Sequence, residues 1–496
     1  MKRVRETVSV NGQIGKGMYG SVYSLTIGPE DIAMKLLNEL KNDDNNFYHS
    51  CDYAREIFGM KTRGLLKSLM VCNQTGRLGL LMPLFGGRLG NGSLPMLSAL
   101  EASLVLGPIA RSLGASVGMH RDIKPSNILM AKDSQSQPVL LDFSLATHQQ
   151  ASSDCNVVTL WYRSPEIIAE LPYTQSSDVW SFGLVFFNVL TGMHLSRTPM
   201  EDNKYSYLID ILDKFGWPDW PELYEKLSCK LGKQILRGPS KGFFNALQVI
   251  ELGPQASFLH VHLAHDLLMG MLKVKPSERL TWSEITSHKF WTIAAGQTGQ
   301  MPSKKCSILS VPCSDAENFL QCASYIHFDS PDMTSFETGQ LSEDSIMENF
   351  QVIDVFLRAG EKFKFKLDTS YYAFSIWKQA KFRGLDKCPE VLSACMFLSA
   401  AYNEDLRIRS LDWTSWSKEF TAEKAPRKFA KTVIRVLLYT QGHWSPRTWS
   451  QYYESLTASH ADCLPITAVY LLACEKQYDL GVQKLHEFLM RHETCF

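Results

Sequence analysis

Residues 120–127, which read HRDIKPSN, constrain the fold of this chain more than any other segment. Transfer of a phosphoryl group requires an acceptor that orients the incoming hydroxyl, a cation for the developing charge and oxygen ligands for magnesium. Asp122 can accept the hydroxyl proton, Lys124 can contact the moving phosphate and Asn127 can bind a metal ion. The spacing predicts a phosphoryl-transfer site, provided that its other parts are present.

A glycine-rich segment stands upstream of this motif. Gly15, Gly17 and Gly20 lie between the apolar runs 8–14 and 21–27, which indicates a hairpin. Glycines let backbone N–H groups approach phosphate oxygens closely, because no side chain intervenes. The segment alone is equally compatible with an ordinary tight turn.

Three charged residues downstream of the glycine-rich segment could help to bind phosphate or magnesium. Lys35 ends the strand pattern 32–35, and Glu56 lies in the helical pattern 52–63. An ion pair between them would position the lysine on the α- and β-phosphates, although a solvated charge at a strand edge is the simpler alternative. After the apolar strand 138–141, Asp142 is placed to bind magnesium.

The order of these motifs, continued by WYRSPE at 161–166 and SDVWSFG at 177–183, resembles a eukaryotic-type protein kinase domain. The resemblance covers residues 8–292 and is greatest to the cyclin-dependent kinases. It implies a bilobal α+β fold over residues 1–295, with an N-lobe to about residue 85 and a C-lobe from about 86. It also implies ATP and Mg²⁺ as cofactors.

The same resemblance assigns individual roles. Asp122 would be the catalytic base, with Lys124, Lys35 and Glu56 as its catalytic partners, and Asn127 and Asp142 would bind the metal. Glu166 would form a buried pair with Arg279, for which a surface arginine is the alternative, and Asp178 would be structural. The nucleotide-binding residues would be Ile14, Gly15, Gly17, Gly20, Val22, Ala33, Lys35, Met82, Leu84, Phe85, Asn127, Leu129 and Asp142.

Residues 157–166, VVTLWYRSPE, are similar to the substrate platform of cyclin-dependent kinases. In that family the second valine is strained and its carbonyl is tied to the arginine, so that proline, which lacks an N–H, suits the pocket. Through Val157, Val158 and Arg163 the resemblance implies protein substrates phosphorylated at Ser or Thr followed by Pro.

Some positions depart from that family. Asp154 falls where an activating threonine would stand, so we expect its charge to order the loop through Arg55 and Arg121; a solvated loop aspartate is the alternative. Ser144 replaces the usual glycine after Asp142 and Phe143. Tyr19 occupies a position of inhibitory phosphorylation in that family.

Bulk properties add limits. The chain has 496 residues, enough for more than one domain, and a formal net charge of +0, so we expect no nucleic-acid partner. It has no apolar run of the ~18 residues that a membrane span needs and no secretory signal, so we expect no membrane partner. Its 12 cysteines are scattered, which favours an intracellular protein of the nucleus or cytoplasm.

The composition changes after the kinase-like region. Residues 296–345 are rich in Ser, Gly, Thr and Asp, which predicts a flexible linker, with 316–328 as an optional short helix. Residues 346–496 show helical periodicity at 346–365, 369–382 and 388–402, and again at 413–420, 426–440, 448–456 and 465–477. This pattern predicts an all-α domain.

Two stretches of that domain, 352–365 and 391–404, resemble helices of a cyclin box. The residues by which cyclins bind their kinase would be Ala401 and Ala430, and the substrate-docking tryptophan would be Val355, so any such domain would bind differently. The resemblance implies activation of the kinase in cis, or by exchange between two chains. An unrelated helical domain that targets the kinase is one alternative, and a pseudokinase scaffold is another.

Overall fold

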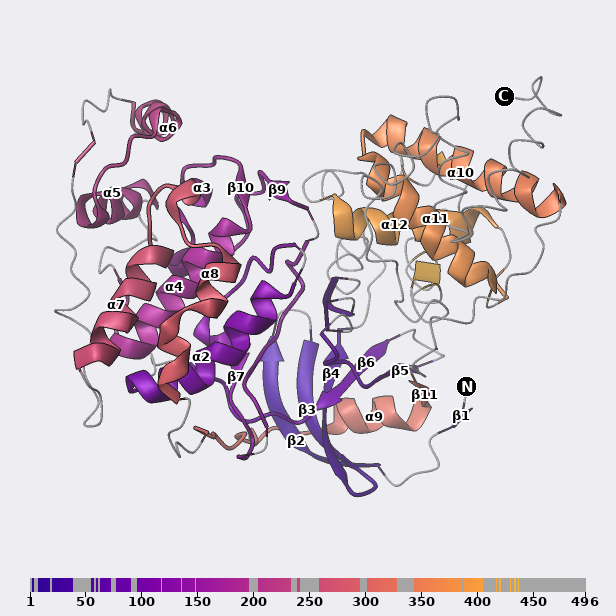
Figure 1. Ribbon diagram of the computed structural model, residues 1–496. Coiled ribbons are helices and arrows are strands. Elements are labelled where there is room, and N and C mark those ends of the chain that lie inside the picture. The colour runs from indigo at the N-terminus through magenta and orange to yellow at the C-terminus, as the bar shows by residue number, and fades with distance from the viewer. Residues whose placement is uncertain are drawn as a thin grey trace.

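In the computed structural model, some parts of the chain are described and others are not. The described residues are 2–3, 8–17, 20–38, 55–57, 59–60, 63–72, 77–90, 96–116, 118–134, 136–147, 149–195, 204–232, 239–240, 258–294, 301–327, 343–382, 384–385, 388–404, 416, 419–420, 429, 432–433 and 436. Figure 1 shows a sheet-containing lobe, a helical lobe and a separate group of C-terminal helices. The first two correspond to the expected bilobal α+β arrangement.

The N-lobe contains an antiparallel sheet of seven strands, in the order β1-β11-β5-β6-β4-β3-β2. The strands are β1 (Lys2–Arg3), β2 (Val8–Gly17), β3 (Gly20–Ile27), β4 (Glu30–Leu37), β5 (Ser68–Cys72), β6 (Leu78–Pro83) and β11 (Ala323–His327). β2 and β3 form the expected hairpin. Successive side chains of β4 alternate between faces: Met34 packs in the cluster that contains Phe319, whereas Ala33 packs in the cluster shared with the C-terminal helices.

The prediction of a flexible linker is wrong for residues 301–327. Residues 304–307 and 309 of this segment line the cleft between the lobes, Ser314–Cys322 form α9 on the N-lobe sheet, and β11 pairs with β5. Phe319 of α9 packs against the sheet over Gly79, where a Cβ would lie 3.0 Å from its ring. The segment folds because β5 offers an unpaired edge whose N–H and C=O groups need partners. Part of the optional helix 316–328 is therefore a strand.

The C-lobe is helical, with a core centred on α4 (Ser176–Thr191), which is buried along nearly its whole length. α2 (Ala99–Gly114) begins at a capping box in which Ser98 and Glu101 satisfy each other's backbone N–H groups. The remaining elements are β7 (Ile128–Leu129), β8 (Val139–Leu140), β9 (Ala151–Ser152), α3 (Pro165–Ile168), β10 (Tyr173–Thr174), α5 (Lys204–Phe215), α6 (Pro221–Leu231), α7 (Phe258–Met271) and α8 (Trp282–Ser287).

Three C-terminal helices confirm the helical periodicity of this region. They are α10 (Glu343–Phe363), α11 (Leu367–Phe382) and α12 (Pro389–Asn403), close to the predicted 346–365, 369–382 and 388–402. α12 is buried nearly all round, as a central helix should be. The helices predicted at 448–456 and 465–477 lie outside the described residues, as do most residues of those predicted at 413–420 and 426–440. Within the described residues, no helix combines the length and hydropathy needed to cross a membrane.

Candidate functional site: the cleft between the lobes

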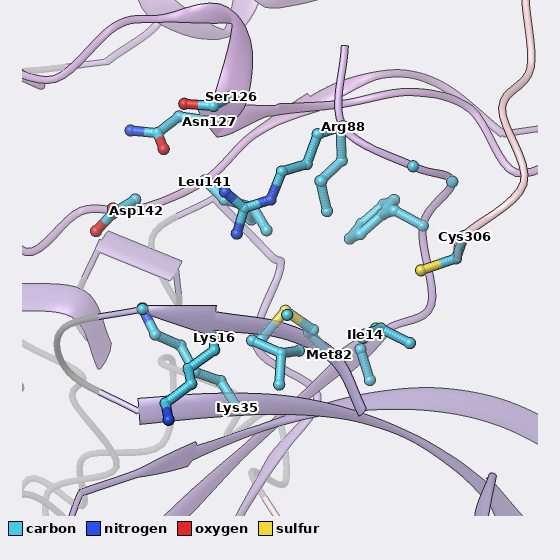
Figure 2. A pocket seen from close by; sticks show the side chains of 18 of the residues that line it. Ile14, Lys16, Lys35, Met82, Arg88, Ser126, Asn127, Leu141, Asp142 and Cys306 are labelled. Carbon is cyan, nitrogen blue, oxygen red and sulfur yellow. The ribbon is translucent and has the colours of Figure 1, made fainter. Parts of the chain in front are cut away.

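A cavity of about 690 Å³ lies between the sheet and the helical lobe. The thirteen residues predicted to bind nucleotide all line it, together with Glu56, Asp122 and Lys124. Figure 2 shows Lys35, Asp142 and Asn127 around one end of the cavity and Ile14 and Met82 near the other. One end is therefore polar and charged, whereas the other has apolar walls.

Lys35 and Glu56 form the expected ion pair. Lys35 Nζ lies 2.7 Å from Glu56 Oε1, and the second carboxylate oxygen of Glu56 accepts a hydrogen bond of 2.6 Å from the backbone N–H of Phe143. Glu56 thus ties the helical residues 55–57 to both the sheet and the segment that carries Asp142. A solvated strand-edge lysine is excluded, since the Lys35 side chain is only 16% exposed.

Charges at this end of the cavity influence one another. Burial lowers the pKa of Lys35, but the carboxylates of Glu56 and Asp142 oppose it and leave that pKa above its usual value. Burial raises the pKa of Asp142, but Lys35 and a hydrogen bond from Ser144 outweigh it, so the net pKa is lowered. Lys35 is therefore held as a cation and Asp142 as a carboxylate.

The Asp122 carboxylate is fixed by several donors. Its Oδ2 accepts from Lys124 Nζ at 2.6 Å and from the Asn127 amide at 2.9 Å. Its Oδ1 accepts from the Thr159 hydroxyl at 2.8 Å, and Lys124 also reaches that hydroxyl at 2.9 Å. Sequence reasoning missed Thr159 as a site residue. The sequence signal that could have identified it is its position in the platform motif, directly after Val157 and Val158 and shortly before Trp161 and Tyr162.

The side chain of Asp178 forms hydrogen bonds with the backbone of the catalytic segment. Its carboxylate accepts the N–H groups of His120 at 2.6 Å and Arg121 at 2.9 Å, and Arg121 adopts a left-handed φ of 65°. Burial raises the pKa of Asp178 to about 6, despite these donors. The structural role expected of Asp178 is to hold this strained backbone.

Glu166 and Arg279 form a fully buried bidentate pair with N–O distances of 2.6 and 2.7 Å. Arg279 also donates to the backbone oxygens of Lys273, Ser176 and Val274. The alternative of a surface arginine is excluded. The pair connects the platform helix α3 to the turn after α7.

Two oxygen donors suit a magnesium ion. Asn127 uses its amide nitrogen to bond Asp122, which leaves its oxygen as the metal-binding atom, and Asp142 accepts from Ser144 through only one carboxylate oxygen. Among the described residues, no cluster of three or more His, Cys, Asp or Glu side chains could hold a metal. Magnesium commonly binds through one or two protein oxygens plus substrate phosphates, so these two residues fit it.

The substrate platform has the predicted geometry. Val158 adopts a left-handed φ of 63°, which is strained for a β-branched residue, and its carbonyl accepts from Arg163 Nε at 2.9 Å. Val157 and Val158 are both buried. The carbonyl is therefore already occupied when a substrate arrives.

The residues of the expected activation-loop anchor are all buried. Arg55, Arg121 and Asp154 are no more than 1% exposed, which excludes a solvated loop aspartate. Tyr173 connects two of them, since its hydroxyl accepts from Arg121 and donates to the backbone oxygen of Asp154 at 2.9 Å. Whether the Asp154 charge orders the loop stays a prediction. Tyr19 and Ala430 lie outside the described residues.

Residues from the expected linker also line the cavity, which sequence reasoning missed. Lys304, Lys305, Cys306, Ser307 and Leu309 contribute to its wall, together with Arg88 of the segment after β6. Figure 2 shows the Arg88 guanidinium extending into the cavity and Cys306 beside Ile14. These residues belong to no recognisable sequence motif, and only the path of the folded chain brings them to the cavity wall.

The sequence of this chain is similar to those of known proteins. Residues 8–291 match the family described as the protein kinase domain, which is more than half of the chain. The chain belongs to the protein kinase family. Members of this family use ATP and Mg²⁺ in general. The match agrees with the ion pair, the fixed aspartate and the metal-binding oxygens described above.

Individual relatives come from two groups of kinases. Human mitogen-activated protein kinase 13 is 35% identical over 179 residues, which cover 35% of this chain and 44% of the relative. Cyclin-dependent kinase E-1 of Arabidopsis thaliana is 28% identical over 220 residues, which cover 40% of this chain and 44% of the relative. The chain therefore spans less than half the length of these curated relatives.

Proposed function

We propose that this chain is a serine/threonine protein kinase that uses ATP and Mg²⁺, prefers Ser-Pro and Thr-Pro sites, and is held active by its own C-terminal helices. The observation that carries the catalytic part is the assembly of Lys35–Glu56, Asp142, Asn127 and Asp122 around one cavity. The intact set argues against a pseudokinase scaffold, and Ser144 bonds Asp142 at 2.9 Å rather than displacing it.

The residues have separate tasks in this mechanism. When bound, ATP supplies the phosphoryl group and Mg²⁺ neutralises its developing charge. Asp122 orients the substrate hydroxyl and accepts its proton, and Thr159 and Asn127 hold that carboxylate in one position. Lys35 would hold the α- and β-phosphates of the nucleotide, and Lys124, 2.6 Å from Asp122, would stabilise the transferred group.

The preference for proline rests on Val158. Because Arg163 already occupies its carbonyl, a backbone N–H after the target residue would be left without that acceptor. Proline has no N–H and loses nothing there. The resemblance of residues 157–166 to the substrate platform of cyclin-dependent kinases implies the same preference.

Support for activation in cis comes from contacts with the C-terminal helices. Arg55, next to Glu56, donates through Nε to the backbone oxygen of Ala401, and Gln149 donates to that of Asn403. Ile57 and Met60 share one apolar cluster with Val352, Phe356 and other residues of these helices. The contacts hold the helical residues that carry Glu56 toward Lys35, as an activating cyclin-like domain would.

The catalytic proposal is tested by transfer of radiolabelled phosphate to matched Ser-Pro and Ser-Ala peptides. We expect the wild type to prefer Ser-Pro and Asp122→Asn to lower kcat by about 10²–10⁴-fold, because the base is lost. Asp266→Asn, at an exposed carboxylate of α7, is the matched control. Equal activity of Asp122→Asn and wild type would exclude the mechanism.

A second experiment separates an activator from a targeting domain. The chain without residues 343–496 is assayed alone and with those residues supplied in trans. An activator restores activity to the separate kinase part, and thereby also supports exchange between chains, whereas a targeting domain has no effect in either form. Gln149→Ala in the full chain removes one contact and should weaken the activation without touching the cavity.

A further inference from the structure

The segment that leaves the kinase fold lines one wall of the cavity between the lobes. We call residues 303–309 the strap. Ser303 of the strap pairs with Ala131 of the C-lobe, and Leu309 pairs with Gln13 of β2 in the N-lobe. Lys305, Cys306, Ser307 and Leu309 line the same cavity as Lys35 and Asp142. The strap therefore bridges both lobes at the rim of the site.

The strap is attached by backbone hydrogen bonds. Gly87 N–H donates to the Lys304 carbonyl at 2.6 Å, Lys304 N–H donates to the Ala131 carbonyl at 3.2 Å, and Leu309 N–H donates to the Gln13 carbonyl at 2.7 Å. Lys304 Nζ adds a bond of 2.9 Å to the Arg88 carbonyl. These bonds connect it to the segment after β6 and to the strand that precedes the glycine-rich turn.

Glycines make room for this path. A Cβ at Gly86 would lie 2.4 Å from the carbonyl oxygens of both Ala131 and Lys304, and one at Gly12 would lie 2.2 Å from Ile308 Cγ2. A side chain at either position would force a neighbour to shift, so the kinase surface leaves room for the strap's backbone at Gly86 and for its Ile308 side chain at Gly12. The contact is thus part of the packed fold on both sides of the cleft.

We propose that the strap is a nucleotide-binding element: it forms the outer wall of the site against the purine nucleoside end of ATP and must detach before the nucleotide leaves. This inference rests on the proposed function. The nucleoside end follows from position, since the strap is bonded near Phe85 and Ile14, and Figure 2 shows Cys306 at the side of the cavity away from Asp142. Leu309 adds to that wall, and the Arg88 guanidinium reaches from its side into the cavity.

The alkylation rate of the Cys306 thiol shows whether bound nucleotide covers this wall, in the chain without any substitution. Burial raises the pKa of its thiol, and Arg88 opposes this only in part, so alkylation by N-ethylmaleimide is slow enough to follow by mass spectrometry. At Mg-ATP tenfold above its Kd, nucleotide-free protein falls about tenfold, and Cys306 alkylation should slow by the same factor. Cys229, exposed on α6, should be unaffected. Equal Cys306 rates with and without bound Mg-ATP would overturn the proposal.

A pair of variants tests retention of the nucleotide. K304P/L309P removes two N–H donors that attach the strap, whereas the control K304A/L309A removes the same side chains and keeps both donors. Dissociation of radiolabelled ATP should be about tenfold faster or more from the proline variant than from the alanine control, in proportion to the lost bonds. Equal rates would overturn the strap's role.

Failure of the proposed function gives a different result. A wild-type chain that binds no Mg-ATP refutes the kinase proposal and the strap's role together. A wild type that binds Mg-ATP but shows neither Cys306 protection nor a difference between the paired variants refutes the strap alone. If K304P/L309P does not fold, as thermal unfolding would reveal, the Cys306 experiment on the wild type decides.

Discussion

The catalytic segment 120–127 and the post-kinase segment 301–327 line the same cavity but are positioned by different means. In the first, side chains make the decisive contacts: Asp178 holds its backbone and Thr159 its carboxylate. In the second, backbone groups do so, through the strap's bonds and the β11–β5 pairing. Chemistry that needs particular side chains leaves a motif, whereas backbone pairing leaves almost none.

This comparison predicts that single side-chain substitutions damage the first region far more than the second. The Glu166–Arg279 pair lies outside both regions but, like the first, depends on side-chain contacts, so Glu166→Gln should have the largest effect on stability, about 3–5 kcal/mol in the free energy of unfolding, because it leaves Arg279 buried without its charge partner. Urea denaturation measures the loss. The double variant Glu166→Gln/Arg279→Met removes both charges and should be less destabilised than Glu166→Gln alone. The reverse order would show that the pair is not the cause.

The difference between the regions also explains what the sequence could predict. Lys35, Glu56, Asp122 and Asp142 were identified because phosphate and magnesium chemistry requires those residue types at restricted spacings. The hairpin and the three C-terminal helices followed from periodicity. The polar composition of residues 301–327 predicts a linker because composition does not report strand pairing, and the edge of β5 that they cover has no sequence signature. Arg88 was missed because a charge at the rim of a cavity looks like any surface charge.

His120 provides a test through pH. Burial lowers its pKa from 6.5 to about 4. Between those values the unfolded chain binds a proton that the folded chain does not, so this residue makes the folded state less stable as pH falls from 6.5 to 4, by up to about 3 kcal/mol. The raised pKa of Asp178 acts in the opposite direction between 3.8 and about 6. The measurement is therefore the difference in unfolding free energy between wild type and His120→Phe across this range.

That difference should move in favour of His120→Phe as the pH falls and become constant below about 4, because both states of the wild type are then protonated. His262→Phe, at an exposed histidine of α7, is the control. Parallel profiles for wild type and His120→Phe would mean that His120 does not titrate as its burial requires.

Thr159 should show a smaller effect that appears in catalysis rather than stability. Thr159→Val keeps the shape but removes the hydroxyl between Asp122 and Lys124, and a lost hydrogen bond to a charged group is worth about tenfold to a hundredfold. We expect kcat to fall by that factor with little change in KM for ATP. Thr159→Ser retains the hydroxyl and should preserve most of the activity. Equal kcat for the Val and Ser variants would remove Thr159 from the site.

The smallest effect is expected at an ion pair between the second region and the N-lobe. Arg77 donates to Asp315 of α9 at 2.6 and 2.9 Å, but Asp315 is half exposed, so solvent weakens the pair. Arg77→Ala should open α9 and β11 only slightly more often, at a cost of about 1 kcal/mol, as measured by hydrogen exchange of the β11 amides. Arg77→Lys keeps the charge, so the exchange rate of its β11 amides should lie between the rates of the wild type and Arg77→Ala. The backbone bonds of β11 to β5 and the packing of Phe319 against the sheet remain in both variants. If Arg77→Ala instead released the segment as completely as Glu166→Gln destabilises the C-lobe, side chains would hold both regions, and the contrast between them would be lost.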